Sequence, residues 1–229
     1  MTMYKPLNSD SLYSNQGNPS ILKLLDESDR QILDIGCGVG SNGKLIHEAY
    51  PLTQVTGVTC SQTEYQRASQ QLSHCIYADV ERDTFYLDQK FDVLLFCHVL
   101  EHLVDPVATI NKLLPYLKLG GKVIIALPNI VNWRERSKLL LGKFEYTDGG
   151  IMDKTHLHFY TFHTAPRYLI APISQLRLES HFASGSFPLG RLRNRLMGEK
   201  ARQAMDRLVC GWLPNLFSHD ILMQAIKLN

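Results

Sequence analysis

The chain has 229 residues, 45% of them hydrophobic and 20% charged, and a formal net charge of +2. This length and composition are typical of a globular protein with one large domain. So small a net charge gives no overall electrostatic reason to bind nucleic acid or a membrane surface. No apolar run approaches the ~18 residues of a membrane span.

The N-terminal segment, residues 1–29, begins with the polar stretch MTMYKPLNSDSLYSNQGN, and we expect a helix in its second half. Because the stretch lacks the apolar core of a signal peptide, we do not expect secretion. The chain has an odd number of cysteines, none in a C-x-x-C pair: Cys37, Cys60, Cys75, Cys97 and Cys210. We therefore expect free thiols in a reducing cytoplasm.

Residues 30–128 alternate between short apolar runs and segments with helical spacing. The apolar runs are residues 31–36, 54–59, 75–80, 91–97 and 121–127. Several are apolar at consecutive positions, which is typical of strands covered on both faces. The last helical segment has Asp105 as an N-cap, Pro106 at its first position and Gly120-Gly121 as a stop. The alternation predicts an α/β fold with a mostly parallel sheet, in which ligands bind at the C-terminal strand ends.

The alternation of apolar runs and helical segments ends after residue 128. Residues 129–163 have a helical first half and then a loop rich in Gly, Asp, His and aromatic residues. Residues 164–229 contain two closing strands, predicted at 175–182 and 220–228, with a helical insert at 189–209 between them. The insert is basic, with Arg191, Arg193, Arg195, Lys200, Arg202 and Arg207 against Glu199 and Asp206. We interpret it as a solvated face; an anionic acceptor or an acidic partner are the alternatives.

The stretch ILDIGCGVG, residues 32–40, has glycines at 36, 38 and 40 and an acid, Asp34, before them. A dinucleotide fingerprint needs the spacing G-x-G-x-x-G, and here the spacing is G-x-G-x-G. The Walker pattern also fails, since the first lysine after this stretch, Lys44, is followed by Leu45 and not by Ser or Thr. A carboxylate beside the loop would repel phosphates and attract an ammonium group. The loop therefore predicts a ligand with an amino-acid portion and a cationic centre.

ILDIGCGVG resembles the first motif of the class I S-adenosylmethionine-dependent methyltransferases. The likeness continues, in that family's order and spacing, through GVTCS, ADVER, FDVLLFCHVLEHLVDP and LLPYLKLGGKVIIALPN, over residues 18–165. LLLGKFEYTDGGIMDKTHLHFYT is similar to a bacterial branch often encoded with glycosyltransferases and with polysaccharide or secondary-metabolite genes.

This resemblance implies one domain, residues 1–229, with a Rossmann-like, doubly wound, seven-stranded, mostly parallel sheet that has helices on both faces. Residues 30–128 would form the cofactor-binding core and residues 129–163 a lid that contacts the acceptor. Residues 164–229 would close the sheet.

The resemblance also assigns S-adenosylmethionine as cofactor and implies its binding residues: Asp34, Gly36, Cys37, Gly38, Gly40, Thr59, Ser61, Asp79, Val80, Cys97 and His98. The glycines would bring backbone close to the methionine part of the cofactor, and Asp34 would attract its amino group. Asp79 would accept the adenine amine and the Val80 N–H would reach a ring nitrogen. Cys97 and His98 would lie next to the sulfonium.

The end of the second strand departs from the family, which has an Asp or Glu there to bind both ribose hydroxyls. This chain has Thr59, whose single hydroxyl cannot form a charge-assisted pair of bonds. Ser61 or Glu64 are the alternative ribose contacts.

Methyl transfer depends on alignment of the attacking atom with the methyl group, and an oxygen nucleophile must also lose a proton. Histidine can accept one near neutral pH. His156 is our first candidate for this base and His98 our second. The alternative for His156 is a structural role, in which it hydrogen-bonds the lid to the core. Trp133 and Tyr146, with His156, are candidates for acceptor contact, with lid packing as the alternative for the two aromatics.

HVLEHL, residues 98–103, contains the H-x-x-E-H spacing of some zinc proteases. It spans a strand end and a helix start, so its side chains would not share one helical face. The related ubiquinone-biosynthesis O-methyltransferases have an acid where His98 stands, before a pair like Glu101-His102, and a divalent ion has been proposed there. With histidine in place of that acid, we assign no metal and expect Glu101 and His102 to support the loop and the start of the next helix.

The sequence thus predicts O-methylation of a hydroxyl on a sugar or secondary metabolite, in the cytoplasm. N-methylation of a small amine, and a cofactor-binding module without catalysis, are the alternatives; a nicotinamide-dependent reductase is disfavoured by the glycine spacing. We expect a small-molecule acceptor, no nucleic acid and no membrane span, and a homodimer is left open. No motif identifies the acceptor.

Overall fold

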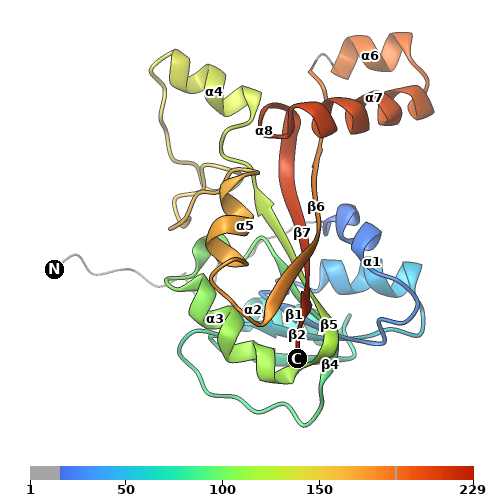
Figure 1. The fold of residues 1–229 in the computed structure, drawn as a ribbon, viewed down its shortest axis with the longest axis vertical. Coiled ribbons are helices and arrows are strands. Elements are labelled where there is room, and N and C mark those ends of the chain that lie inside the picture. The colour runs from blue at the N-terminus through green and yellow to red at the C-terminus, as the bar shows by residue number, and fades with distance from the viewer. Residues whose placement is uncertain (1–15, 189) are drawn as a thin grey trace, which may run out of the picture.

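The computed structural model describes residues 16–188 and 190–229. Its strands form one seven-stranded sheet in the order β3-β2-β1-β4-β5-β7-β6 (Figure 1). The strands are β1 (Gln31–Ile35), β2 (Gln54–Thr59), β3 (His74–Tyr77), β4 (Phe91–Cys97), β5 (Leu117–Pro128), β6 (Leu176–Gly185) and β7 (Ser218–Lys227). The first five pair in parallel, and β7 is antiparallel to both β5 and β6. The predicted doubly wound, mostly parallel α/β sheet is confirmed.

The helices follow the strands closely along the chain. They are η1 (Pro19–Leu24), α1 (Ser41–Ala49), α2 (Gln62–Ala68), η2 (Leu100–His102), α3 (Pro106–Leu113), η3 (Leu114–Tyr116), α4 (Trp133–Leu140), α5 (Thr164–Leu169), α6 (Gly190–Leu196), α7 (Glu199–Trp212) and α8 (Pro214–Phe217). As predicted, Asp105 caps α3: its carboxylate accepts from the Ala108 N–H at 2.9 Å, and Pro106 follows at the first helical position. No described helix has the length and apolar character needed to cross a membrane. The polar residues 1–15 lie outside the described part of the chain.

Both faces of the sheet are apolar because alternate residues of each central strand enter different cores. In β4, Leu94 and Phe96 pack into the core that includes α3 and α5, whereas Val93 and Leu95 pack into the core that includes η1 and α1. All four side chains are fully buried. This two-sided burial explains the uninterrupted apolar runs of the sequence.

Two predicted boundaries were wrong. The third strand was expected to reach residue 80 but ends at Tyr77, because the Asp79 carboxylate accepts from the Glu81 and Arg82 N–H groups and turns the chain. The Gly120-Gly121 stop lies inside β5 instead of behind a helix. There Gly120 has a φ of 72°, and the β4–β5 pairing shifts register between Phe91 and Val93.

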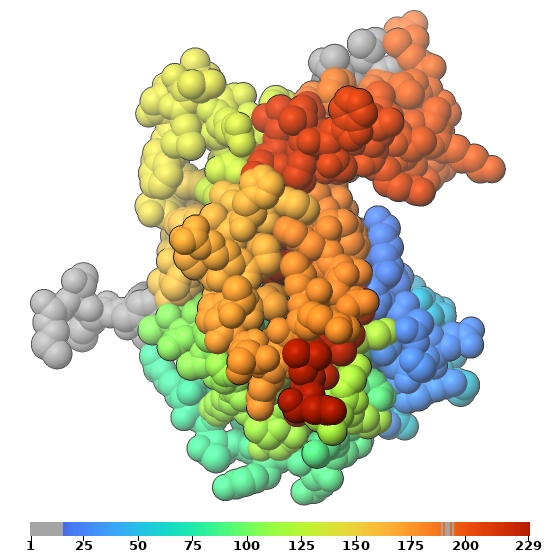
Figure 2. Space-filling model, in the orientation of Figure 1, coloured from blue at the N-terminus to red at the C-terminus, as the bar shows by residue number. Residues whose placement is uncertain are grey.

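The basic insert is helical, as predicted, and forms α6 and α7. Figure 1 shows α4 and the α6–α7 pair at the same end of the molecule, and Figure 2 shows them as two separate protrusions. Arg193 departs from the solvated face that we expected, since it is buried and pairs with Asp206 at 2.6 Å, joining α6 to α7. Residue 189 and the side chain of Arg191 lie outside the described part.

Asp34, in the middle of β1, is the most deeply buried acid near the glycine loop. Both of its carboxylate oxygens are inaccessible to solvent and have no hydrogen-bond partner within the described residues. Burial, with a smaller effect of the Cys75 thiol, raises the pKa of Asp34 to about 8. The carboxyl group is therefore mostly protonated at pH 7 in this structure.

We predict that Asp34→Asn stabilises the protein relative to the natural chain by an amount that grows with pH. The unfolded chain releases the Asp34 proton from about pH 3.8 upward, while the folded chain keeps it until about pH 8. Stability is therefore lost as pH rises between these values, by at most ~1.4 kcal/mol per pH unit, and asparagine removes that loss. Urea unfolding of both proteins from pH 4 to 8 would measure it, because other groups cancel in the difference. A difference independent of pH would contradict the raised pKa.

Candidate functional site

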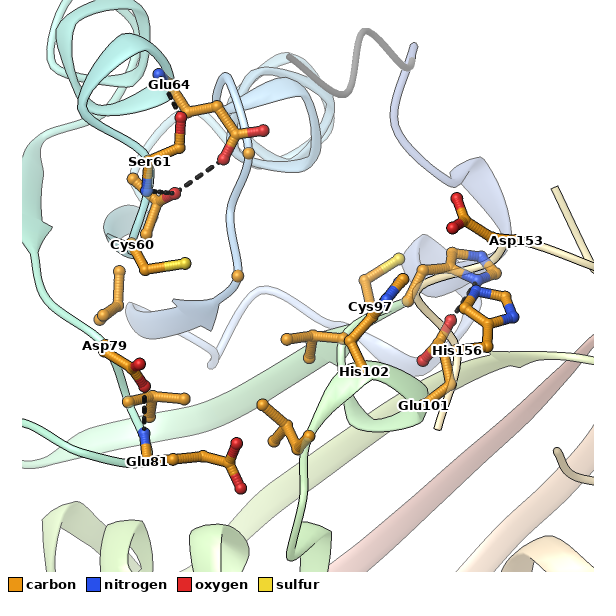
Figure 3. A pocket seen from close by; sticks show the side chains of 18 of the residues that line it. Cys60, Ser61, Glu64, Asp79, Glu81, Cys97, Glu101, His102, Asp153 and His156 are labelled. Carbon is orange, nitrogen blue, oxygen red and sulfur yellow. Dashed lines mark hydrogen bonds and ion pairs between the residues drawn. The ribbon is translucent and has the colours of Figure 1, made fainter. Parts of the chain in front are cut away.

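A cavity of about 600 Å³ opens where the carboxyl ends of β1 and β4 diverge. It is lined by the glycine loop, the end of β2, the loop after β3, the end of β4, residues of the segment 150–156 and the start of β7. In Figure 3 the labelled side chains form two groups, with Cys60, Ser61, Glu64, Asp79 and Glu81 on one side and Cys97, Glu101, His102, Asp153 and His156 on the other. Reversal of strand order makes this the expected ligand position in a doubly wound sheet.

The glycine loop forms one end of the cavity. The Gly36 and Cys37 N–H groups both donate to the Val58 carbonyl, at 2.8 and 3.0 Å, which turns the chain away from β1. Gly36 has a φ of 69°, and a Cβ there would lie 2.6 Å from a methyl of Val99. Gly36 and Gly38 line the cavity, and both have left-handed backbone. The loop therefore offers bare backbone to a ligand.

Three residues assigned to this end do not reach the cavity surface. Asp34 lies beneath the loop in β1, and the Cys37 side chain is buried. Gly40 is the N-cap of α1, and its φ of 89° serves that turn. None of the three residues lines the cavity. They therefore affect a ligand only indirectly, through the shape of the loop and the polarity beneath it.

The end of β2 carries a carboxylate that comes from α2. The Thr59 hydroxyl donates to Glu64 Oε2 at 2.7 Å, and Glu64 is buried yet lines the cavity. Ser61 Oγ accepts from the Glu64 N–H at 3.3 Å and caps α2. The hydroxyls of Thr59 and Ser61 thus position Glu64, which occupies the end of the strand where the family has its acid. The S-x-x-E capping pattern of residues 61–64 was the signal for this position.

The loop after β3 brings Asp79 and Val80 to the same wall. Asp79 accepts from the Glu81 N–H at 2.9 Å and pairs with Arg82 at 3.6 Å, so its carboxylate is fixed at the rim. Val80 is buried and lines the cavity, while its carbonyl accepts from Lys112 Nζ at 2.9 Å. The loop shape is therefore held by side-chain bonds on both sides.

His98, directly after β4, lies between two carboxylates. Its Nδ1 is 3.5 Å from Glu101 Oε1 and its Nε2 is 3.7 Å from Asp220 Oδ1. Burial opposes the charged ring, but the hydrogen bond to Glu101 and the charges of Glu101 and Asp220 outweigh it and raise the pKa of His98. His98 also has a φ of 56°, which is rare for a residue with a side chain. A raised pKa favours the protonated ring, which has no lone pair to accept a proton, so His98 is the weaker candidate for the base.

His156 lies on the opposite wall from Asp79 and contacts His102, with ring centroids 4.6 Å apart. Burial and the neighbouring His102 lower the pKa of His156, so its imidazole is neutral. The segment around it is bonded to η2, since the Leu157 and His158 N–H groups donate to the Glu101 carbonyl at 2.8 and 3.1 Å. The structure thus brings His156 together with the Glu101-His102 pair.

The role expected for Glu101 and His102 at the next helix was wrong. The Glu81 carboxylate accepts from the N–H groups of Val104 and Asp105 at 2.9 Å, and Asp105 itself caps α3. The Glu101 and His102 side chains line the cavity. The HVLEHL motif therefore points its acid and histidine at the ligand space.

The two aromatic candidates for acceptor contact lie away from the cavity. Trp133 begins α4, and Tyr146 is 57% exposed and packs edge-on against Phe144. Neither lines the cavity. Asp220 of β7, which does line it beside His98, was missed because its place depends on β7 pairing with β5, far apart in sequence.

Residues 33–123 match a family model described as a methyltransferase domain. The trans-aconitate 2-methyltransferase of Klebsiella pneumoniae (strain 342) is 29% identical over 110 residues, which are 48% of this chain and 43% of that protein. That of Enterobacter sp. (strain 638) is 28% identical over 128 residues, 56% and 49% of the two chains. The chain spans about half the length of the curated relatives it matches.

Solved methyltransferases share the fold. The plantazolicin methyltransferase BpumL in complex with SAH has a TM-score of 0.56 and 21% identity, over 88% of this chain and 77% of that one. A SAM-dependent methyltransferase from Archaeoglobus fulgidus has a TM-score of 0.58 and 17% identity, over 92% and 95%. The match to a methyltransferase domain over residues 33–123 and the fold shared with solved methyltransferases confirm the resemblance to the class I S-adenosylmethionine-dependent methyltransferases.

We predict that Gly36→Ala destabilises the fold more than Gly142→Ala. The two glycines have φ values of 69° and 72°, so alanine meets similar backbone strain at both. A Cβ at position 36 would lie 2.6 Å from Val99, whereas nothing lies within 4 Å of one at position 142. The extra loss of unfolding free energy at position 36 should be ~1–3 kcal/mol, measured by urea unfolding. Equal losses would show that the loop does not depend on this contact.

Proposed function

We propose that the chain binds S-adenosylmethionine in this cavity and transfers its methyl group to a hydroxyl of a small-molecule acceptor. The observation that carries the proposal is the order of groups along the carboxyl ends of β1, β2 and β3. Bare glycine backbone, the Glu64 carboxylate and the Asp79 carboxylate follow one another around one cavity. They suit the methionine, ribose and adenine parts of the cofactor in that order.

The residues present fit this cofactor. A side chain at Gly36 would collide with Val99, so only glycine lets the loop pack against Val99 while its backbone lines the cavity. Glu64 supplies the ionisable acid that Thr59 lacks, and a carboxylate can bind two vicinal hydroxyls. The cavity volume of about 600 Å³ lies within the range of small-molecule sites.

The charge of the cavity supports a cationic cofactor and a neutral acceptor. Its lining includes seven carboxylates, those of Glu64, Asp79, Glu81, Asp83, Glu101, Asp153 and Asp220, against one arginine, Arg82. Such a lining attracts a sulfonium and repels acids. A tricarboxylate such as trans-aconitate, named for the relatives, is therefore disfavoured here, and a sugar or secondary-metabolite hydroxyl is favoured. The same lining makes a small amine the second candidate acceptor.

In the proposed reaction the acceptor oxygen attacks the methyl carbon in line with the departing sulfur. The new C–O bond forms as the C–S bond breaks, and the sulfur keeps the electron pair. The chain contributes alignment and a place for the hydroxyl proton. His156 suits that task better than His98, because a neutral imidazole has a lone pair that can accept a proton or bind a cation.

The setting of the reaction is part of the proposal. We assign the protein to the cytoplasm, which the five free cysteines support. We also take the acceptor to be a small molecule and not nucleic acid, since an acidic cavity would repel a phosphate backbone.

We predict that Glu64→Gln weakens S-adenosylmethionine binding by about tenfold or more. The amide keeps the shape of Glu64 but loses the charge that strengthens its bonds to ribose hydroxyls. Isothermal titration calorimetry would measure the affinity, with Glu48→Gln on the exposed face of α1 as the matched control. Unchanged affinity in Glu64→Gln would contradict the ribose assignment, and no binding by the natural chain would contradict the proposed function.

We predict that His156→Ala lowers turnover by ~10²-fold or more while cofactor affinity changes little. Radiolabelled S-adenosylmethionine and a panel of hydroxylated and amine metabolites, with product mass spectrometry, would identify the acceptor and give the rate. His158→Ala is the control, because His158 lies in the same segment without lining the cavity. Full activity of a folded His156→Ala protein would remove His156 from the reaction.

A further inference from the structure

One cluster on the cavity wall has the composition of a metal site. Glu101, His102 and His156 each offer a ligand atom, and these atoms all lie within 4.8 Å of one another. We propose that the three side chains bind a divalent transition-metal ion, for which Zn²⁺ is the probe, and that the ion holds the acceptor oxygen. The catalytic part of this inference rests on the proposed function; the metal site itself does not.

The first observation is an unsatisfied buried carboxylate. Glu101 is 1% exposed, and its Oε2 has no hydrogen-bond partner within the described residues. Its other oxygen faces His98 Nδ1 at 3.5 Å. A buried carboxylate oxygen without a partner is costly, and a cation bound to Oε2 would satisfy it. Because Glu101 also lines the cavity, such a cation would be open to a ligand.

The second observation is how the two histidine rings are held. His156 Nδ1 lies 3.1 Å from the Ile151 carbonyl, which can only accept, so Nδ1 carries the proton. The Thr155 hydroxyl donates to Asp153 Oδ1 at 2.6 Å and therefore accepts from His102 Nδ1 at 2.9 Å. With Nδ1 of each ring used in this way, Nε2 is the atom that can bind a cation. Histidines that bind metals are held in this way, through the other ring nitrogen. The Ile151 carbonyl holds His156, and the Thr155 hydroxyl, itself bonded to the Asp153 carboxylate, holds His102.

Two imidazoles and one carboxylate are the donor set of several catalytic zinc sites, which keep a further position for water or substrate. Imidazole with carboxylate suits Zn²⁺ and its neighbours in the first transition series better than Mg²⁺ or Ca²⁺. The three side chains come from η2 and from the segment after α4, so an ion would join these elements at the cavity wall. Histidine at position 98 is not part of the set, because its ring is between Glu101 and Asp220.

With the ion bound, the metal and not His156 would activate the acceptor hydroxyl. An acceptor hydroxyl bound to the metal has a lowered pKa and releases its proton to solvent. The resulting oxygen attacks the methyl carbon, the C–O bond forms, and the C–S bond breaks with its electron pair on sulfur. His156 then acts as a ligand and does not hold the proton itself.

The test is metal binding by the full chain after chelator treatment and gel filtration. Calorimetric titration with Zn²⁺ should show about one ion per chain, and Co²⁺ should give the visible absorption of a low-coordinate site. Glu101→Gln and His156→Ala should each weaken Zn²⁺ binding by more than ~100-fold. Thr155→Val, which removes only the partner of His102, should weaken it by ~10–100-fold. His158→Ala serves as the control and should bind like the natural chain.

The outcomes separate this inference from the proposed function. Absence of stoichiometric Zn²⁺ binding, or equal affinity in His156→Ala and the natural chain, would overturn the site. Methyl transfer at an unchanged rate by the chelator-treated chain would overturn the catalytic role of the ion and leave the methyltransferase proposal standing. Zn²⁺ binding that depends on the three ligands, in a chain that fails to bind S-adenosylmethionine, would support the metal site and contradict the proposed function.

Discussion

The contact between Gly36 and Val99 sets the geometry on which the rest of the site depends. It joins the loop after β1 to the second residue after the end of β4, across the point where strand order reverses. A side chain at position 36 would occupy the space of the Val99 methyl, so the two strand ends can approach only through glycine. With the loop fixed there, its bare backbone faces the cavity, and the chain after β4 must turn at His98. The left-handed backbone of His98 brings the next turn, with Glu101 and His102, back toward the same space.

The region beneath the glycine loop and the wall of the cavity differ in charge. The acid beneath the glycine loop, Asp34, is neutralised by burial, so the loop sits over a polar but uncharged group. The cavity wall, in contrast, holds seven carboxyl groups, and two of them, those of Glu101 and Asp220, face His98 and raise its pKa. A cationic cofactor and an uncharged acceptor suit that field, since an acid would meet repulsion from several sides. His156, whose pKa is lowered by burial and by His102, lies close to Glu101, whose Oε2 has no hydrogen-bond partner within the described residues.

The sequence predicted the residues of the cavity best where a residue's position is set by local structure, such as the end of a strand. Gly36, Gly38, Thr59, Ser61, Asp79, Val80, Cys97 and His98 all line the cavity, as their places at strand ends indicated. Asp34 lies in β1 beneath the loop, and Cys37 and Gly40 belong to the loop but do not line the cavity, because a tight turn can expose only some of its residues. Trp133 and Tyr146 were chosen for their chemical character alone, and the path of the chain around α4 puts them elsewhere. Glu64 was only an alternative from the sequence, yet it lines the cavity. It lies in the first turn of α2 and places a carboxylate near the end of β2, where Thr59 has none.

The sequence by itself determined the class of the fold and the position of the ligand end. Apolar runs of strand length, helix caps and a glycine loop are local features whose physics acts over a few residues, and they fixed the order β-α-β along the core. Tertiary structure decided which side chains meet. The contact of His156 with Glu101 and His102, and that of Asp220 with His98, join segments far apart in the chain. Such contacts follow from strand pairing, helix packing and the path of a loop, and these depend on the whole chain folding at once.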